Sequence, residues 1–543
     1  MTISIKNIIP FLFFTCCIFN VFAQPDLPSE EIEVIKDFEA ALEESFKISI
    51  KPELPQVDTT SKNLLYDIPN KTINLDYLPP KIRPIAMKRD KIPDVYNGYL
   101  KLGYGIPSSP YGEVSYHSSD PKKYEVGAHF IHHSANYNEI ENQKFSKTNI
   151  GLDGTYFHDL GFAIAGDIGY DIDQVFFYGY DHAEQSYTSE QVRQRFSTFN
   201  FDLNFYNGES TQGDINYWAR AKVLNIIDNF AVSETDLDID LGVTKWFNET
   251  HPLTIKIVTD FTTYDTLLEK QHLNNFYFQP SFTYHADMFK VKIGGNLTAF
   301  KDNFTFYPDI EATVNVIGSK LTAFAGWEGD IYKNNFKSVT DYNPFVVSRF
   351  GIKNTGYNNF YGGVRGNIKV FDYEIQAGFK KADDLALFLR NNMGQGVDSL
   401  RFNVLYDSVD IIYLIGTLKA TLLKGFDVFL TFGQNVYTLN NQLKAWGLPA
   451  LEVNLGAVFT TMEDKLRIKG ELFVENGIPY INSDGLPDNL NGLYDLSFGA
   501  HYQATKNFGI FFDLNNIANN KRERWEGYPT YGINILGGIT ARF

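Results

Sequence analysis

The stretch Gly532-Ile533-Asn534-Ile535-Leu536-Gly537-Gly538-Ile539-Thr540-Ala541-Arg542-Phe543 decides the fold of this chain. Successive side chains on a strand point to opposite faces, so its alternation predicts a strand with one apolar and one mostly polar face. The apolar face of this closing strand is predicted to carry Ile533, Ile535, Ile539 and Phe543, and Tyr531, just before them, continues the same alternation. An edge strand of a water-soluble β-sandwich has the same pattern, so the alternation alone leaves both structures open.

The other end of the chain predicts export. Residues 1–23 contain one early positive charge, Lys6, then the apolar run 8–18, and they finish on Val21-Phe22-Ala23. This order of charged, apolar and small residues is typical of a cleaved signal peptide, and we expect cleavage after Ala23. Export, together with a last strand of alternating polarity that ends on Phe, is typical of an outer-membrane β-barrel.

Cysteine usage limits the chemistry of the mature protein. The chain has two cysteines, Cys16 and Cys17, and both lie in the predicted signal peptide. The mature chain is therefore expected to have no disulfide, no thiolate metal site and no cysteine nucleophile.

Composition favours a barrel over other classes of protein. Aromatic residues make up 15% of the chain, with 33 Tyr and 46 Phe, and barrels place such residues in girdles at both membrane interfaces. The formal net charge of −17 argues against a nucleic-acid partner, because nucleic acids attract basic surfaces.

Residues 24–93 differ from the rest of the chain, because prolines recur throughout their second half. Proline fixes φ and lacks a backbone donor, which excludes a continuous helix or a central strand. We expect a mostly extended segment in the periplasm or threaded into a lumen; a segment without fixed structure is the alternative. From residue 52 onward these prolines are Pro52, Pro55, Pro69, Pro79, Pro80, Pro84 and Pro93.

From residue 94 to residue 543 the alternation is persistent and predicts a transmembrane antiparallel β-barrel. Leucine, isoleucine and valine alternate with aspartate over 236–243, and similar patterns occupy 198–205, 451–459 and 508–515. The segments between turn signals give about 22 strands, with 14 or 16 longer strands as the alternative. Turns of a few residues alternate with long polar loops, which is the pattern of short periplasmic turns and long extracellular loops.

The closing segment resembles the end of a TonB-dependent outer-membrane receptor. The resemblance rests on residues 512–520, on Trp525-Glu526-Gly527-Tyr528-Pro529-Thr530-Tyr531-Gly532 and on the Phe-ended last strand. It implies residence in the outer membrane of a Gram-negative-type cell, contact with outer-membrane lipid, assembly by the barrel-assembly machinery and coupling to TonB or other envelope proteins.

The chain departs from that family in two respects. The family's barrel encloses a globular plug that is considerably longer than residues 24–93. The periplasmic coupling motif is represented only by Glu31-Ile32-Glu33-Val34-Ile35, which resembles a TonB box as any acidic, β-branched pentapeptide would. If the barrel is large, residues 24–93 or inward-folded loops must fill its lumen.

No motif predicts an enzyme, a cofactor or a metal centre. The spacing of His129, His132 and His133 comes closest to that of metal ligands. Hydrated side chains at the base of a loop explain these histidines better. No spacing supports His117, Ser118, Ser119 or His501 as members of a hydrolase triad. Asp236, Asp238 and Asp240 are predicted to face the lumen, where either cation attraction or hydration explains them.

The sequence therefore predicts a non-enzymatic outer-membrane barrel that mediates solute uptake or passage. A structural or accessory barrel subunit of a larger outer-membrane complex is the alternative, and a hydrolase at the barrel rim is a third, weaker hypothesis.

Overall fold

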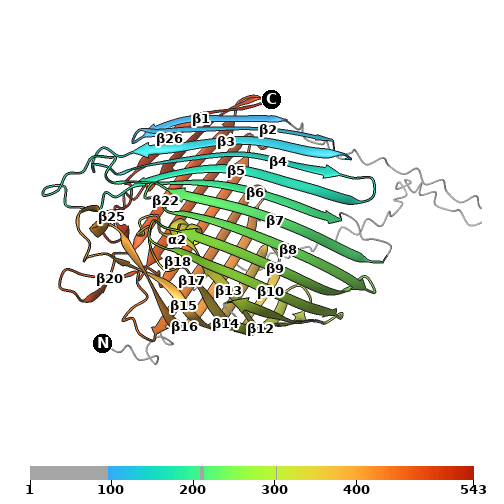
Figure 1. Ribbon diagram of the computed structural model, residues 1–543. Helices are drawn as coiled ribbons and strands as arrows, with labels where there is room; N and C mark the ends of the chain where they lie inside the picture. The colour runs from blue at the N-terminus through green and yellow to red at the C-terminus, as the bar shows by residue number, and fades with distance from the viewer. Residues whose placement is uncertain (1–95, 121, 208–212, 301–302) are drawn as a thin grey trace, which may run out of the picture. The chain divides into compact units, whose positions relative to one another are not determined.

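The alternating segments form one antiparallel sheet that closes on itself (Figure 1). The computed structural model describes residues 96–120, 122–207, 213–300 and 303–543. The sheet has 22 strands in chain order, and β1 pairs with both β2 and β26, so the sheet has no free edge. The predicted fold class and strand number are confirmed.

The strands of the barrel have the following bounds: β1 Gly98–Ile106, β2 Ser109–Asp120, β3 Tyr124–Asn136, β4 Lys144–Phe157, β5 Phe162–Phe176, β6 Arg193–Asn207, β7 Ile215–Asp228, β8 Ser233–Phe247, β9 His251–Asp265, β10 Lys270–His285, β11 Phe289–Phe300, β12 Asn303–Ile317, β13 Leu321–Asn334, β14 Lys353–Ile368, β15 Phe371–Arg390, β16 Phe402–Leu423, β17 Phe426–Leu439, β18 Leu451–Thr461, β19 Leu466–Asn476, β22 Leu493–Gln503, β23 Phe508–Asn515 and β26 Asn534–Arg542. Two short hairpins lie in the connections: β20 Pro479–Ile481 pairs with β21 Pro487–Asn489, and β24 Glu523–Trp525 pairs with β25 Tyr528–Pro529. The connections also contain the helix α2 Phe336–Tyr342 and the 3-10 helix η2 Gly396–Leu400.

The barrel closes through the pairing of β26 with β1, in which Ile539 lies opposite Leu102 and Ile535 opposite Ile106. Phe543 extends the ladder, because it exchanges two backbone hydrogen bonds with Gly98 at 2.7 and 3.0 Å. A Cβ added to Gly98 would lie 2.2 Å from the Phe543 ring, so the terminal ring lies directly over this glycine. The last residue therefore seals the seam with both its backbone and its ring.

The closing strand is shorter than the sequence predicts. It begins at Asn534, and Tyr531 and Ile533 precede it in the last loop. The Tyr531 ring packs edge-on against Tyr137 and Phe145, with ring centroids 5.9 and 5.8 Å apart. These ring contacts hold Tyr531 in the loop, so the alternating pattern overextends the strand.

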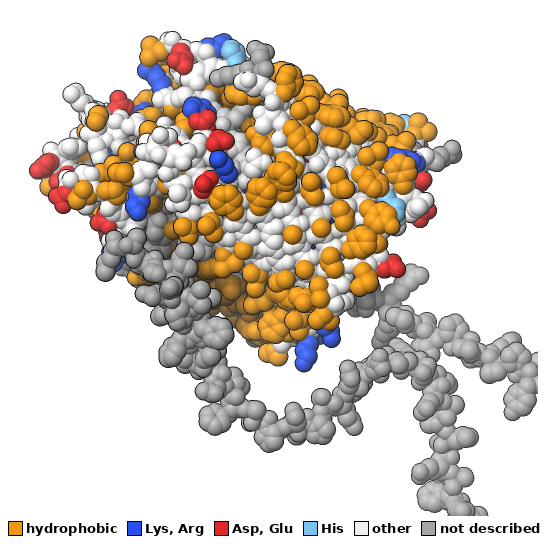
Figure 2. Space-filling view, turned by 90° about the horizontal axis from the view of Figure 1, so that it is seen from below, with side chains coloured by type: hydrophobic (Ala, Val, Ile, Leu, Met, Phe, Trp, Pro, Cys, Tyr) orange, Lys and Arg blue, Asp and Glu red, His pale blue; other side chains and the backbone are white. Residues whose placement is uncertain are grey.

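The two faces of the wall differ as the alternation predicts. Leu241, Phe261 and Ile539 are exposed on the outside, at 46%, 45% and 52%, whereas Asp236 points inward and is buried. Figure 2 shows a broad band of apolar side chains on the face in view, with most charged side chains toward the ends of the barrel. A polar interior and an apolar exterior are what a lipid-facing barrel requires.

The ends of the barrel are built from connections of different length. At the end that holds both β1's start and β26's end, connections have two to seven residues, and Gly425 takes φ +79° in one of the shortest. At the opposite end, six connections have 11 to 18 residues, including 177–192, 335–352 and 516–533. Four connections there, 107–108, 229–232, 266–269 and 301–302, are as short as turns, so the long loops are not spread evenly.

Three sequence predictions lie outside the described residues: the signal peptide 1–23, the segment 24–93 and the TonB-box-like residues Glu31, Ile32, Glu33, Val34 and Ile35. Within the described part of the chain, neither helix is long and apolar enough to cross a membrane.

Candidate functional site: the lumen and its loop closure

Long loops from different sides of the barrel meet in one aromatic cluster, which we call the loop core. Its centre is Tyr528, which is 2% exposed. The Tyr528 ring stacks on Phe345 with centroids 4.0 Å apart and lies edge-on to Tyr178 at 5.0 Å. Other members are Phe176, Phe177, Tyr180, Val192, Val339, Val346, Ala386, Phe388, Leu400, Phe402 and Trp525.

The origin of these loops shows that the loop core crosses the mouth of the barrel. Tyr178 lies between β5 and β6, Phe345 between β13 and β14, Leu400 between β15 and β16, and Tyr528 between β23 and β26. Neighbouring strands are about 4.8 Å apart, so loops that leave the ring so many strands apart can meet only across the opening. Figure 1 shows β20 and β25 gathered with the loops at the left end of the view.

Arg390, the last residue of β15, joins three of these loops. Its guanidinium donates hydrogen bonds to the backbone oxygens of Gly179 at 2.5 Å, Glu526 at 3.1 Å and Ser399 at 3.3 Å. One fixed fork of donors thus holds three separate segments at defined spacing. The Tyr528 hydroxyl adds a fourth link by donating to the Leu400 oxygen at 2.5 Å.

Burial in the loop core changes the acidity of its side chains. It raises the pKa of Tyr178 to about 12, so this hydroxyl stays protonated and donates to the Pro529 oxygen at 3.0 Å. Burial likewise raises the pKa of Glu526 to about 6, although the nearby Arg390 opposes the shift. The loop core therefore contains one carboxyl group that titrates close to neutral pH.

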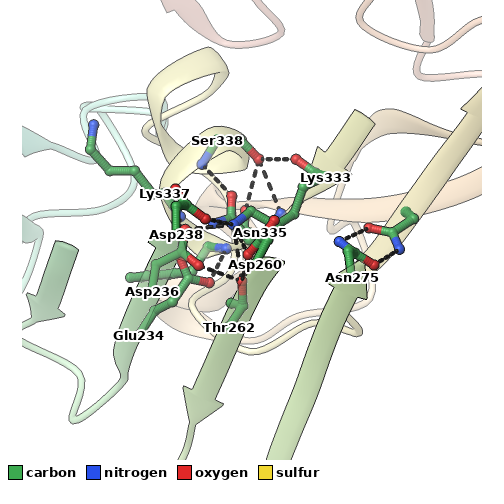
Figure 3. Close-up of polar contacts among 12 residues, drawn as sticks. Glu234, Asp236, Asp238, Asp260, Thr262, Asn275, Lys333, Asn335, Lys337 and Ser338 are labelled. Atoms are coloured by element: carbon green, nitrogen blue, oxygen red, sulfur yellow. Dashed lines mark hydrogen bonds and ion pairs between the residues drawn. The ribbon is translucent and has the colours of Figure 1, made fainter. Parts of the chain in front are cut away.

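The loop 335–352 is fastened to the inner wall through its helix. Asn335 and Ser338 form a capping box, and the Glu234 carboxylate of β8 accepts from the backbone N–H groups of Phe336 at 2.6 Å and Lys337 at 3.1 Å. The first backbone donors of a helix have no partner within it, so a wall carboxylate is a suitable acceptor. Figure 3 shows Glu234 aimed at this end of α2.

An ion cluster lies beside this attachment (Figure 3). Lys333 of β13 places its ammonium 2.5 Å from Asp236 Oδ2, 2.7 Å from Asp260 Oδ1 and 3.9 Å from Asp238 Oδ1. The same ammonium donates to the Thr262 hydroxyl oxygen at 3.0 Å. Because β8 and β9 lie five and four strands away from β13 in the sheet, the cluster ties together parts of the wall that are not adjacent.

This cluster corrects the sequence expectation of one row of lumen acids. Asp236 and Asp238 face Lys333, whereas Asp240 pairs with Lys256 at 2.9 Å. Asp236, Asp238 and Asp260 lie close enough together to hold a metal ion, yet the Lys333 ammonium already takes the place of the cation. Internal ion pairing, rather than hydration alone or a bound cation, accounts for these acids.

The wall below the loop closure is polar and hollowed. A pocket of about 340 Å³ lies against β7–β10 and β13, and a second of about 310 Å³ shares Lys256, Gln279 and Asp330 with it. Both are lined by basic and acidic side chains in nearly equal number. Such a surface suits water and polar solutes rather than an apolar ligand.

Four of the histidines singled out in the sequence have hydrogen-bond partners of their own. His129 bonds Asn149 at 2.7 Å, His132 bonds Thr148 at 2.9 Å, and His133 bonds Ser109 at 3.1 Å. His501 bonds Thr540 at 3.1 Å. Each of these four rings thus has its own polar partner on another strand.

Sequence reasoning missed Lys333, Asp260 and Arg390. Lys333 is the second-last residue of β13, where a charge carries no periodic signal, and Asp260 is one inward-facing acid within β9 whose partner lies on a distant segment of the chain. Arg390 binds backbone oxygens, which exist at every residue, so its partners have no sequence signature. Tyr528 is part of the resemblance to the receptor family, but nothing in that pattern places it at the centre of a loop core.

Comparison with known proteins identifies the fold. No family model matches the chain. No curated protein matches it either. Among solved structures, the ferripyoverdine receptor of the outer membrane of Pseudomonas aeruginosa is 10% identical, with 84% of this chain and 73% of that chain covered and a TM-score of 0.60.

Two further structures are similar. The FrpB iron transporter from Neisseria meningitidis is 8% identical over 83% of this chain and 82% of its own, with a TM-score of 0.66. The copper transporter OprC is 11% identical over 83% of this chain and 80% of its own, with a TM-score of 0.60. The described barrel therefore has the outer-membrane receptor fold that the resemblance to TonB-dependent receptors predicts.

Proposed function

We propose that this protein is a gated outer-membrane barrel that mediates solute uptake or passage, and that the loop core is its outer gate. The observation that carries this proposal is the junction at Tyr528 and Arg390, where loops from separate parts of the ring meet above a polar lumen. A hydrated interior offers a path to a polar solute, and a packed loop layer blocks it until the loops part.

The construction of the closure supports a movable gate. The wall is held by continuous backbone pairing between strands, whereas the loops are held mainly by ring contacts and side-chain hydrogen bonds, with only scattered backbone hydrogen bonds between them. Loops of this kind open at a lower free-energy cost than paired strands do. A solute that contacts the loops in the open arrangement more strongly than in the closed one would shift the population toward opening.

The similar structures agree with a role in transport. Their printed names describe a ferripyoverdine receptor, an iron transporter and a copper transporter. Energy coupling through Glu31–Ile35 stays a prediction, because those residues lie outside the described part of the chain.

The test is entry of solutes into vesicles that contain the purified full chain. We expect slow entry of small polar solutes with the wild type and several-fold faster entry with Arg390→Met, which removes the links among three loops. Arg365→Met is the matched control, because Arg365 lies on the inner wall away from the loops and is 3.8 Å from Glu374.

Two results would contradict the proposal. Equal entry with the wild type and Arg390→Met would show that the loops are not the barrier. Impermeable vesicles with both proteins, together with a stoichiometric partner recovered in mild detergent, would favour the accessory-subunit alternative.

A further inference from the structure

A pocket of about 390 Å³ lies on the inner face at the seam where the sheet closes, and we call it the seam pocket. It spans β19, β22, β23, β26 and β1, toward the end of the barrel that has the short turns. Its charged and titratable lining consists of Lys101, Arg467, Lys469, His501, Asp513 and Arg542. Four bases thus face one acid.

This charge balance separates the seam pocket from the other pockets of the wall. The pocket against β7–β10 has three bases and four acids, and its neighbour has two bases and three acids. The pocket near Arg365 has two of each. A surplus of bases in a chain with a net charge of −17 is a local feature that overall composition does not explain.

Two of the four bases are already engaged. Lys469 pairs with Asp513 at 3.0 Å. The Lys101 ammonium lies 4.1 Å from the centre of the Phe511 ring and 5.0 Å from that of Tyr111, so the two rings fix its position. The single acid of the pocket is therefore used by Lys469.

The other two bases, Arg467 and Arg542, differ from these two. Among the residues that the structure describes, neither the Arg467 nor the Arg542 guanidinium makes an ion pair or a hydrogen bond. His501 lies between them, within electrostatic reach of Arg467, Arg542 and Lys101. A group of cations held close together on a low-dielectric wall attracts a counter-ion.

A glycine keeps the pocket open. A Cβ at Gly499 would lie 2.1 Å from Lys469 Cε and 2.5 Å from Asp513 Oδ1. The Lys469–Asp513 pair therefore lies flat over Gly499, and its atoms occupy the space that a side chain would fill. The pair stays against the wall, which leaves the space before Arg467 and Arg542 clear.

We propose that the seam pocket binds an oxyanion, either a phosphate group or a carboxylate of a small solute. The planar fork of an arginine matches such groups with two parallel hydrogen bonds, and two free guanidinium groups beside a fixed ammonium supply the required charge. The pocket faces the lumen, so its ligand comes from the aqueous interior and not from lipid. Binding requires no opening of the loops, so the site does not depend on the proposed gate.

The test is calorimetric titration of the full-length protein in detergent with inorganic phosphate at low ionic strength, and separately with acetate. We expect saturable binding of at least one of them and weaker binding as chloride is added. Arg467→Gln and Arg542→Gln should each weaken it by about tenfold or more, since each removes the charged, two-pronged hydrogen bonds that an arginine makes to an oxyanion. Arg365→Gln is the matched control and should bind like the wild type.

Folding of each variant is checked by its heat-dependent migration in a gel. If a glutamine variant fails to fold, Arg467→Lys and Arg542→Lys keep the charge but lose the fork, and they should show a smaller loss of affinity. Phosphate-only or acetate-only binding assigns the ligand class within the proposal. Absence of saturable binding of both anions, or an equal loss in Arg365→Gln, would overturn it.

Discussion

The two ends of this barrel are built on different principles. At one end, connections of two to seven residues join the strands, and the nearby inner face carries a cationic pocket in which Arg467 and Arg542 have no partner among the described residues. At the other end, loops of up to 18 residues cross the opening and pack their aromatic rings together. Backbone pairing defines the first end, and side-chain contacts define the second, so mutations should affect the two ends very differently.

The largest effect is expected from Tyr528→Ala. Removing a fully buried aromatic side chain typically costs about 3–5 kcal/mol, and here the loss falls on the loop core and spares the strand pairing. Hydrogen exchange should rise in loops 177–192, 335–352 and 516–533 while the strands stay protected. The outward-facing Tyr494→Ala is the control, and exchange that rises equally in the strands would show that the two ends are not separable.

A comparable loss is expected from Lys333→Met, which leaves Asp236 and Asp260 buried without their cation. Breaking a buried ion pair from one side costs about 3–5 kcal/mol. Limited proteolysis should then cut within 335–352. Lys337→Met is the control, because the exposed Lys337–Asp341 pair of α2 contributes only about 0.3–0.5 kcal/mol. Resistance of the Lys333 variant to protease would mean that the ion cluster does not hold the loop.

A smaller effect on stability is expected from Phe543→Ala at the opposite end. The variant keeps both backbone hydrogen bonds to Gly98 and loses only the ring, which is 62% exposed, so about 1 kcal/mol of apolar contact is at stake. Because that contact seals the seam, assembly in the membrane should fall more than for Ile539→Ala, an outward-facing residue of the same strand. Equal assembly of the two variants would remove the special role of the terminal ring.

The smallest effect is a pH dependence of the loop core. The pKa of Glu526 is raised to about 6 in the packed loops, against an ordinary value of 4.5. A raised pKa means that the packed state binds the proton more tightly, so the stabilisation is complete below about pH 4.5 and is lost as the pH rises through about 6. Quenching of the buried Trp525 by acrylamide should increase from pH 5 to pH 7, and Glu526→Gln should flatten this change. An unchanged profile in that variant would assign the effect to another group.

The same contrast separates the parts of the structure that can be predicted from the sequence from those that cannot. Alternation of apolar and polar residues predicts the wall, because a lipid belt and a wet lumen impose the same two-residue period on every strand. The alternation fails at Tyr531. Its place in the two-residue period fits the apolar face, but its ring packs in a loop and the strand does not extend to it.

The loop closure could not be predicted for a physical reason. Arg390 binds backbone oxygens, and Tyr528 meets Phe345, which lies 183 positions earlier in the sequence, so neither contact leaves a local pattern. Lys333 and its aspartates come from strands far apart in the chain, and only the closed sheet brings them together. The seam pocket likewise joins the first strand to the last ones, which follows from closure and not from spacing.

The central claim is that the loop core blocks the lumen, and single-channel conductance in planar bilayers tests it most directly. We predict brief or very small openings for the wild type and large, long-lived openings for the double variant Arg390→Met/Tyr528→Ala, because that variant keeps the wall and loses the junction of the loops. A double variant as silent as the wild type would contradict the account, and so would a wild type that conducts continuously.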